Sequence, residues 1–523
     1  MSRSSRAVRK IAAIAVALVS AVSAAACGTS AGEGGSGAGG VATNGGSMTF
    51  VAQYETTTMD PLITYVQSTN DTFRTEAIFD LLAYTDTTGK VVPRIAQSIT
   101  PDTTHTVWTI KLRPGVQFSD GTPYDAAAVK FSIDRDAVEA NHSTQYAVAK
   151  DLKSTVVDPL TLRITLPSPN AQFDQVVSQS FSLVPSPTAV KKEGKDFGQH
   201  PVGAGPFVLQ EWVKGDHMSF TRNPHYWQPG LPHLDSVTLK VVEDPQQATN
   251  FLLSGEAQLF EVQHTSTLAA GEKAGLQSVK TAVNGGDGLY FNTRRAPFDD
   301  PRARQAVGHA LDLSELAKVV YHGLVKPPKN LFATGSPYYD PKYDYPAPDK
   351  AKAQQLFDEL AAEGKPVDFT YVTTSGAEDV KLAQYVQSRL ATFRNVTMNI
   401  DTQSGAERIQ SYRTSNFQMT TGATFFLNPY PVAQSTFSTG GVLNYPLYSD
   451  PDVDAALADA VTTTDESRRK QDYDTFLQHY TQDLPTLPTQ ATELGVLFTG
   501  DVAGVQTFEL GCTPFWEQIG SKK

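Results

Sequence analysis

The chain has 523 residues and a mass of 56.5 kDa, which is too long for one core and indicates about two or three domains. Hydrophobic residues make up 40% and charged residues 19% of the chain, so most of it is globular rather than disordered. The 43 Lys and Arg against 55 Asp and Glu give a net charge of −12. This charge argues against non-specific nucleic-acid binding and against lying flat on an anionic membrane.

Residues 1–26 are predicted to be a signal peptide. Its first ten residues hold four basic side chains: Arg3, Arg6, Arg9 and Lys10. The apolar run from Ile11 to Ala26 is short for a bilayer of about 30 Å and ends in small residues, although a single membrane anchor is the alternative. Ala24-Ala25-Ala26-Cys27 resembles a bacterial lipobox, in which leucine is commoner than alanine three residues before the cysteine. We therefore expect Cys27 to become a lipid-carrying N-terminus that anchors the protein outside the cell membrane.

Residues 27–47 are predicted to be the lipidated cysteine and a flexible linker. Gly28 to Ser47 is rich in Gly, Ser and Ala and cannot pack a core, and about twenty such residues reach about 25 Å. The other cysteine, Cys512, is expected to be a buried small hydrophobe, so the fold does not depend on a disulfide. No apolar run after residue 26 approaches membrane-spanning length.

The first half of the body alternates between strand and helix patterns. Residues 107–113 alternate between apolar and polar side chains, which predicts a half-buried strand. Asp125 is placed to cap a helix that follows it. Residues 162–166 and 237–241 repeat the alternation and predict two more strands.

The second half contains a strand–helix–strand pattern. Residues 367–371 and 396–400 alternate as strands, and residues 379–393 between them have helical spacing, so a βαβ unit with a parallel sheet is expected. Asp349 to Glu363 predicts an amphipathic helix that Gly364 ends.

Pro- and Gly-rich breaks near 199–206, 284–288 and 485–488 divide the body. They favour two α/β lobes, the first at residues 48–283 and the second at residues 284–489. Periodicity alone leaves open whether the last 30 or so residues rejoin the first lobe.

The sequence offers little catalytic chemistry. The ten histidines are scattered, without metal-site spacing and without a neighbouring cysteine, so no metal site is predicted. No nucleophile elbow, phosphate loop or dinucleotide loop occurs in the body, and we predict neither catalytic residues nor a cofactor. Asp299-Asp300 precede Pro301, which indicates a helix start rather than a catalytic acid pair.

The tyrosines suggest a binding surface instead. The chain has 20 of them, and a buried hydroxyl requires a partner, so core packing alone does not account for them well. Those in polar loops are candidates to line a cleft: Tyr65, Tyr412, Tyr430 and Tyr445. An acidic, tethered, two-lobed body without catalytic groups suggests a capture protein.

A series of short motifs then resembles one protein family. In chain order they begin at Asp60-Pro61, Ile78-Phe79-Asp80, Val92-Pro93-Arg94, Trp108-Thr109-Ile110, Ala128-Val129-Lys130, Pro201-Val202-Gly203, Arg222-Asn223-Pro224, Phe291-Asn292-Thr293 and Asp300-Pro301-Arg302. The chain resembles solute-binding family 5 of bacterial ABC importers, the lipoprotein group that binds peptides, oligopeptides or nickel. Each motif is modest alone, but the motifs occur in register, and the resemblance runs from Thr49 to about Leu487.

The resemblance implies a two-lobed, periplasmic-binding-protein-like fold of type II, cluster C. It further implies an extra subdomain in the first lobe, at about residues 85–198, and a C-terminal segment, residues 490–523, that returns to the first lobe. The lobes are expected to close over a small solute or peptide and then dock on a membrane permease. We expect a monomer that contacts the membrane only through its lipid and does not bind nucleic acid.

The resemblance also suggests solute contacts. Tyr65 and Gln67 resemble a first-lobe strip that faces the solute. In the second lobe, the strip at residues 419–429 resembles the segment that pairs with the ligand backbone. Its candidates are Gly422, Thr424, Phe425, Phe426 and Asn428.

The second-lobe strip departs from the family pattern. Peptide binders usually carry an acid there for the ligand's α-ammonium group, whereas this chain has Phe425-Phe426. Losing that carboxylate removes a charge-assisted hydrogen bond of about 1.5–3 kcal/mol. An acid elsewhere, such as Glu407, is the alternative anchor.

We therefore predict an extracytoplasmic, lipid-anchored binding protein of an ABC importer, not an enzyme, whose solute is a peptide or peptide-like molecule. A blocked peptide, an aromatic solute or a glycoside is the alternative on the same fold. A secreted lipoprotein hydrolase is a further alternative, and it requires a nucleophile and a base in the cleft.

Overall fold

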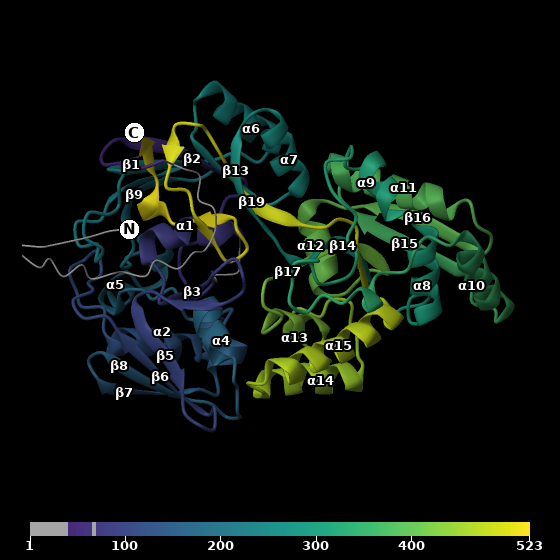
Figure 1. The fold of residues 1–523 in the computed structure, drawn as a ribbon, viewed down its shortest axis with the longest axis horizontal. Coiled ribbons are helices and arrows are strands. Elements are labelled where there is room, and N and C mark those ends of the chain that lie inside the picture. Colours follow the sequence, from purple (N-terminus) through teal and green to yellow (C-terminus); the bar gives the residue numbers. More distant parts are fainter. Residues whose placement is uncertain (1–39, 65–68) are drawn as a thin grey trace, which may run out of the picture. The chain divides into compact units, whose positions relative to one another are not determined.

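The computed structural model describes residues 40–64 and 69–523 (Figure 1). The predicted signal peptide, Cys27, most of the linker, Tyr65 and Gln67 lie outside the described residues. Among the described residues, no helix is both long and apolar enough to cross a bilayer. The chain forms two lobes of mixed α/β structure.

The first lobe is built on a seven-stranded sheet in the order β13-β19-β12-β2-β11-β10-β9. Its strands are β13 (Gln277–Ala282), β19 (Glu493–Phe498), β12 (Leu259–Val262), β2 (Ser47–Ala52), β11 (Ser236–Val241), β10 (His217–Arg222) and β9 (Phe207–Val213). The helices α1 (Thr69–Phe79), α6 (Pro245–Ser254) and α7 (Thr265–Lys273) pack against these strands.

The C-terminal segment completes the core of this lobe. β19, drawn in yellow in Figure 1, lies between β12 and β13, although some 200 residues separate it from them along the chain. The short helix η4 (Trp516–Gln518) supplies Trp516, which is fully buried and meets the rings of Phe50 and Phe220 edge-on at 4.9 and 5.4 Å. Short strands complete this region: β1 (Ala42–Thr43), β20 (Val502–Ala503), β21 (Thr507–Phe508), β22 (Thr513–Pro514) and β23 (Gly520–Lys522). Cys512 is buried and free, as predicted.

A separate antiparallel sheet in the order β5-β6-β8-β7 follows α1 in the chain. Its strands and neighbours are β3 (Ala83–Thr85), β4 (Val91–Pro93), β5 (Ala96–Pro101), β6 (Val107–Leu112), α2 (Ala126–Asp136), η1 (Glu139–Asn141), α3 (Tyr146–Ala149), β7 (Lys153–Asp158), β8 (Thr161–Thr165), α4 (Phe173–Ser180), α5 (Pro187–Glu193) and η2 (Gly194–Gln199). The predicted alternation is confirmed, because Trp108, Ile110 and Leu112 are buried while Lys111 is exposed. The predicted cap is also confirmed, since the Asp125 carboxylate accepts from the Ala128 N–H at 2.9 Å.

The second lobe is built on a five-stranded sheet in the order β16-β15-β17-β14-β18. Its strands are β16 (Val396–Thr402), β15 (Val367–Thr373), β17 (Met419–Phe426), β14 (Asn284–Phe291) and β18 (Thr486–Pro488). Its helices are α8 (Pro301–Ala310), α9 (Leu313–Val319), η3 (Pro341–Tyr343), α10 (Lys350–Ala362), α11 (Ala377–Leu390), α12 (Gly405–Arg413), α13 (Val432–Phe437), α14 (Pro451–Thr462) and α15 (Glu466–Asp483).

Three sequence predictions are confirmed in the second lobe. β15, α11 and β16 form the expected βαβ unit with parallel strands. Asp349 caps α10, and Gly364 follows the helix with a positive φ of 77°. Asp300 caps α8 with Pro301 in its first turn, so this acid pair starts a helix.

Two chain segments cross between the two large sheets. The first passes from β13 to β14 through Val283, and the second passes from β18 to β19 through residues 489–492. They are hydrogen-bonded to each other, since the Val283 N–H donates to the Thr492 carbonyl at 3.1 Å. The Gly-rich segment 284–288, which the sequence marks as a break, is part of β14. Gly285 and Gly286 adopt positive φ angles of 80° and 136°, which explains glycine at both positions.

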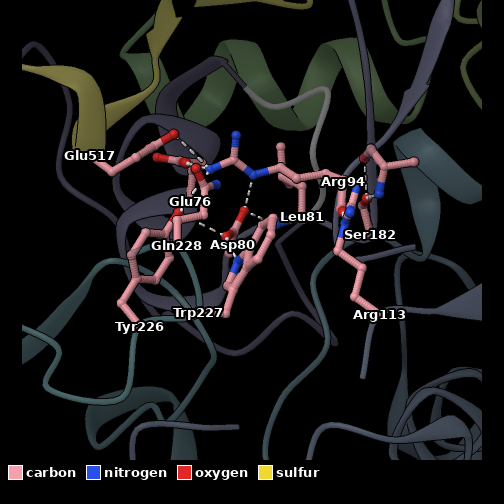
Figure 2. A network of polar contacts seen from close by, with 11 residues as sticks. Glu76, Asp80, Leu81, Arg94, Arg113, Ser182, Tyr226, Trp227, Gln228 and Glu517 are labelled. Carbon is pink, nitrogen blue, oxygen red and sulfur yellow. Dashed lines mark hydrogen bonds and ion pairs between the residues drawn. The ribbon is translucent and has the colours of Figure 1, made fainter. Parts of the chain in front are cut away.

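A buried charged cluster joins α1 to the C-terminal segment (Figure 2). Arg94 forms ion pairs with Asp80 and, at 2.9 Å, with Glu517. Tyr226 and Trp227 donate hydrogen bonds to the second Asp80 oxygen at 3.1 and 2.8 Å, so these two aromatic residues belong to the polar cluster. Burial is the main cause that raises the pKa of Glu76, the nearby carboxyl in Figure 2. These contacts fix the C-terminus to the first lobe.

Candidate functional site

The candidate site lies where the carboxyl ends of parallel strands meet the crossing segments. In the first lobe, β2 and β12 are parallel and lead into Gln53-Tyr54 and Gln263-His264. In the second lobe, β14 begins beside the carboxyl end of β17, with Asn284 opposite Phe426. Open α/β sheets bind ligands outside the carboxyl ends of their strands, so this is where a ligand is expected.

The first-lobe wall presents a tyrosine and a histidine. The Tyr54 side chain is 42% exposed, and its hydroxyl lies 3.5 Å from His264 Nε2. The carbonyl of Tyr54 accepts a hydrogen bond of 2.6 Å from Arg74, which α1 holds in a fully buried position. This hydrogen bond from Arg74 holds the backbone of Tyr54 in place.

Glu261 lies beneath this wall. It is fully buried, and one oxygen accepts from Gln263 Nε2 at 2.6 Å. Burial raises the pKa of Glu261 to about 8, although the charge on Arg74 opposes this shift. Glu261 is therefore largely protonated near neutral pH.

The second-lobe wall presents Asp287 from β14. One of its carboxylate oxygens accepts from Gln490 Nε2 at 3.1 Å, and its backbone carbonyl accepts from the Thr489 N–H at 2.9 Å. Burial raises the pKa of Asp287, and the nearby His264 lowers it. Asp287 thus contacts the second crossing segment and interacts with the first-lobe wall.

Carboxyl groups from both lobes raise the pKa of Tyr54. Burial raises the pKa of Tyr54, and Glu261, Asp287 and Asp379 raise it further. Next to Asp379, Glu378 accepts a hydrogen bond of 3.0 Å from Ser266 of α7, so α11 touches the first lobe here. We call Tyr54, His264, Asp287, Gln490 and Thr492 the crossing site.

The predicted second-lobe strip is divided by strand alternation. Phe426 is fully buried and meets Phe332 edge-on at 5.8 Å in the core, so it offers no surface to a solute and its prediction as a contact is corrected. Phe425 points to the opposite face, because successive strand residues alternate. It is half-buried against a cluster that includes Val283 and Cys512, beside the first crossing segment.

The other strip candidates have local roles. Gly422 leaves room for aromatic side chains, since a Cβ there would lie 2.6 Å from the Tyr290 ring and 2.8 Å from the Tyr412 hydroxyl. The Thr424 hydroxyl is buried and hydrogen-bonded to Tyr290 at 2.5 Å. Asn428 accepts from the Tyr430 N–H at 3.1 Å. Gly422, Thr424, Phe425 and Phe426 all belong to β17, and Phe426 faces the core.

Glu407 does not replace the missing acid of the strip. Its carboxylate accepts hydrogen bonds from the Ser404 N–H and hydroxyl at 2.9 and 2.7 Å, in a capping box at the start of α12. This exposed carboxylate is engaged in capping, so the alternative anchor is corrected.

A second contact between the lobes involves Tyr430, one of the cleft candidates. Its ring packs against the buried cluster of the β5-β6-β8-β7 sheet, and its hydroxyl accepts from Asn170 Nδ2 at 2.7 Å. Beside it, the Ala171 N–H and Gln172 Nε2 donate to the Val461 and Ala460 carbonyls at 2.9 and 3.1 Å. We call these contacts the rim contact. Tyr412 and Tyr445 instead pack against each other as tilted rings, with centroids 4.1 Å apart.

One group of possible metal ligands occurs among the described residues, formed by Asp450, Asp452 and His479. Asp450 caps α14 and contacts His479 Nδ1 at 2.8 Å, while Asp452 is largely exposed. Helix capping accounts for this arrangement without an ion.

Comparison with known proteins gives consistent matches. Residues 90–444 match the model of "Bacterial extracellular solute-binding proteins, family 5 Middle". The glutathione-binding protein GsiB of Salmonella paratyphi A is 30% identical over 458 residues, which cover 84% of this chain and 87% of GsiB.

Solved structures show the same fold. DppA from Helicobacter pylori, in complex with the peptide STSA, has a TM-score of 0.79 at 22% identity, covering 92% of this chain and 99% of DppA. NikA from Brucella suis, in complex with Fe(III)-EDTA, has a TM-score of 0.78 at 24% identity, covering 91% of this chain and 100% of NikA.

Proposed function

Since the chain belongs to family 5 of the bacterial extracellular solute-binding proteins, we propose that it captures a peptide or peptide-like solute between its lobes for an ABC importer. Proteins of this family are extracytoplasmic, bind small solutes or peptides, work with permease subunits and are not enzymes. The name of GsiB refers to a tripeptide-like solute, which supports the substrate class proposed for this chain.

The observation that carries this proposal is the pair of crossing segments. Only Val283 and residues 489–492 carry the chain between the two large sheets within the described residues. Two adjacent segments act as a hinge when backbone rotation at a few residues moves one lobe against the other. A solute that contacts both walls of the crossing site binds the closed form better and therefore shifts the population toward it.

The test is native mass spectrometry of the purified mature chain, followed by recovery of the solute. We expect a small adduct that is released chemically intact on denaturation, and titration of glutathione or short peptides should reduce the radius of gyration in solution scattering. Turnover of the solute would instead favour the hydrolase alternative. Absence of any adduct and of any response to titrated solutes would overturn the proposal.

We further propose that residues 1–26 are removed and that Cys27 carries the lipid anchor. The basic start, the apolar run and the small residues before Cys27 support this. Cys27→Ala should release the protein from the membrane fraction into the soluble fraction, while Cys512→Ala, the matched control at the buried cysteine, should leave it membrane-bound. Equal membrane retention of the Cys27 variant would contradict the anchor.

A further inference from the structure

Asp287 is an acid on the strand that enters the second lobe, not in the strip where the family pattern places one. It lies between Gly286 and Gly288 in β14, where neither neighbour has a side chain to cover it. Gln490 holds one carboxylate oxygen at 3.1 Å. A carboxylate has room for several donors, so this single side-chain contact leaves most of its acceptor capacity unused.

Two buried polar atoms without partners lie near this acid. Gln490 and Thr492 are only 4% and 3% exposed, yet Gln490 Oε1 and Thr492 Oγ1 have no hydrogen-bond partner in the described structure. The Thr492 hydroxyl lies close to Gly286, the residue before Asp287, since a Cβ on Gly286 would lie 3.0 Å from it. The Gln490 Nε2 group donates to Asp287, and the atom of this side chain that has no partner is the acceptor Oε1.

The carboxyl groups of α11 lie near Asp287 and share its charge sign. Glu378 raises the pKa of Asp287. Asp379 and Asp287 both raise the pKa of Tyr54 on the opposite wall. The nearby His264 lowers the pKa of Asp287. Lys381, one turn after Glu378 in α11, contacts His322 at 3.1 Å instead. The crossing site therefore combines acceptor oxygens and acidic side chains, and no lysine or arginine among the described residues forms an ion pair with Asp287.

We propose that the crossing site is a cation-accepting subsite, in which Asp287 receives an ammonium or guanidinium group of the solute and Gln490 Oε1, Thr492 and Tyr54 complete its hydrogen bonds. This proposal deepens the proposed function and rests on it. It gives the solute's cationic group an anchor that the strip at residues 419–429 does not supply. A solute held there touches both lobes, so its charge contributes directly to closure.

The experiment measures binding of matched probe pairs to the mature chain by thermal shift and calorimetry. The pairs are glutathione and N-acetylglutathione, tri-alanine and N-acetyl-tri-alanine, and N-acetylarginine and N-acetylcitrulline. The second member of each pair lacks the cationic group and is called the uncharged partner. We expect the cationic member to bind at least about tenfold more tightly than its uncharged partner, because the partner cannot form the charge-assisted hydrogen bond to Asp287.

Asp287→Asn should remove about tenfold or more of the affinity for the cationic probe and leave the uncharged partner unchanged. Asp401→Asn, which changes an exposed acid of the same lobe, is the charge control and should bind as the wild type does. Circular dichroism checks the fold of each variant, and Asp379→Asn is the second site variant, with a smaller expected loss.

The outcomes separate the two proposals. Probes that bind with equal affinity in charged and uncharged forms, or that bind Asp287→Asn as tightly as the wild type, overturn the cation-accepting subsite and leave the proposed function standing. A chain that binds no probe and carries no co-purified solute overturns the proposed function, and the subsite falls with it.

Discussion

Replacing Tyr430 should weaken solute binding, although Tyr430 is not part of the crossing site. Tyr430 belongs to the second lobe, but its ring packs against the first-lobe cluster that contains Trp108 and Phe173, and its hydroxyl accepts from Asn170. Burial in that cluster raises the pKa of Tyr430 to about 12. Under the proposed hinge motion, opening of the lobes would separate these groups, so we expect the rim contact to stabilise the closed form selectively.

The size of the effect follows from the contacts that are lost. Tyr430→Phe removes one hydrogen bond of about 1 kcal/mol, which corresponds to about a fivefold loss of affinity. Tyr430→Ala also removes about 2 kcal/mol of ring burial, so the combined loss is on the order of 100-fold at most. The backbone contact from Ala171 to Val461 remains in both variants and limits the loss.

Calorimetry with a bound solute measures the affinity, and solution scattering measures the radius of the unliganded protein. We expect weaker binding and a larger unliganded radius in the order wild type, Tyr430→Phe, Tyr430→Ala. Tyr339→Phe is the matched control, because its hydroxyl donates to Asp344 within the second lobe. Unchanged affinity and radius in Tyr430→Ala, with the melting temperature preserved, would refute the assigned role.

Three further predictions concern stability. At pH values between its ordinary pKa and about 8, Glu261 is protonated in the folded state and ionised in the unfolded state. The free energy of unfolding therefore falls as the pH rises through this window. Chemical denaturation should show Glu261→Gln gaining about 3 kcal/mol relative to the wild type between pH 4 and 7, and a parallel pH profile would contradict this. Gly422→Ala should lose about 1–3 kcal/mol in urea unfolding, because the added methyl overlaps Tyr290, and an unchanged midpoint would exclude the overlap. Arg94→Ala should lose about 3–5 kcal/mol, because buried carboxylates are left unpaired, whereas Arg302→Ala in an exposed pair should lose far less.

Much of the fold could be predicted because local patterns carry it. The alternation of Trp108, Ile110 and Leu112 and the caps at Asp125 and Asp349 depend on neighbouring residues, and all of them are confirmed. The pairing of Arg94 with Asp80 and Glu517 could not be predicted in this way. It joins segments up to 423 residues apart, and no local periodicity specifies such a contact.

The candidate site was less predictable, and its signals were of unequal quality. Ser404 and Glu407 have the spacing of a capping box, a local signal that would have excluded Glu407 as a ligand anchor. Phe425 and Phe426 are adjacent, so strand alternation alone places only one of them on a given face. Asp287 has no comparable local signal, because its glycine neighbours resemble a chain break. In the structure the same glycines have no side chains to cover the Asp287 carboxylate.

The place of β19 and Trp516 in the first lobe has a consequence for biogenesis. A polypeptide that emerges amino-terminus first presents residues 284–488, the contiguous second lobe, before β19 and Trp516 become available. Until then the first lobe lacks an interior strand and its central indole, so its early segments cannot complete their fold before the final stretch of the chain is available. We therefore expect a protein shortened by its last 30 or so residues to reach the outside of the cell with one finished half and one half open to proteolysis.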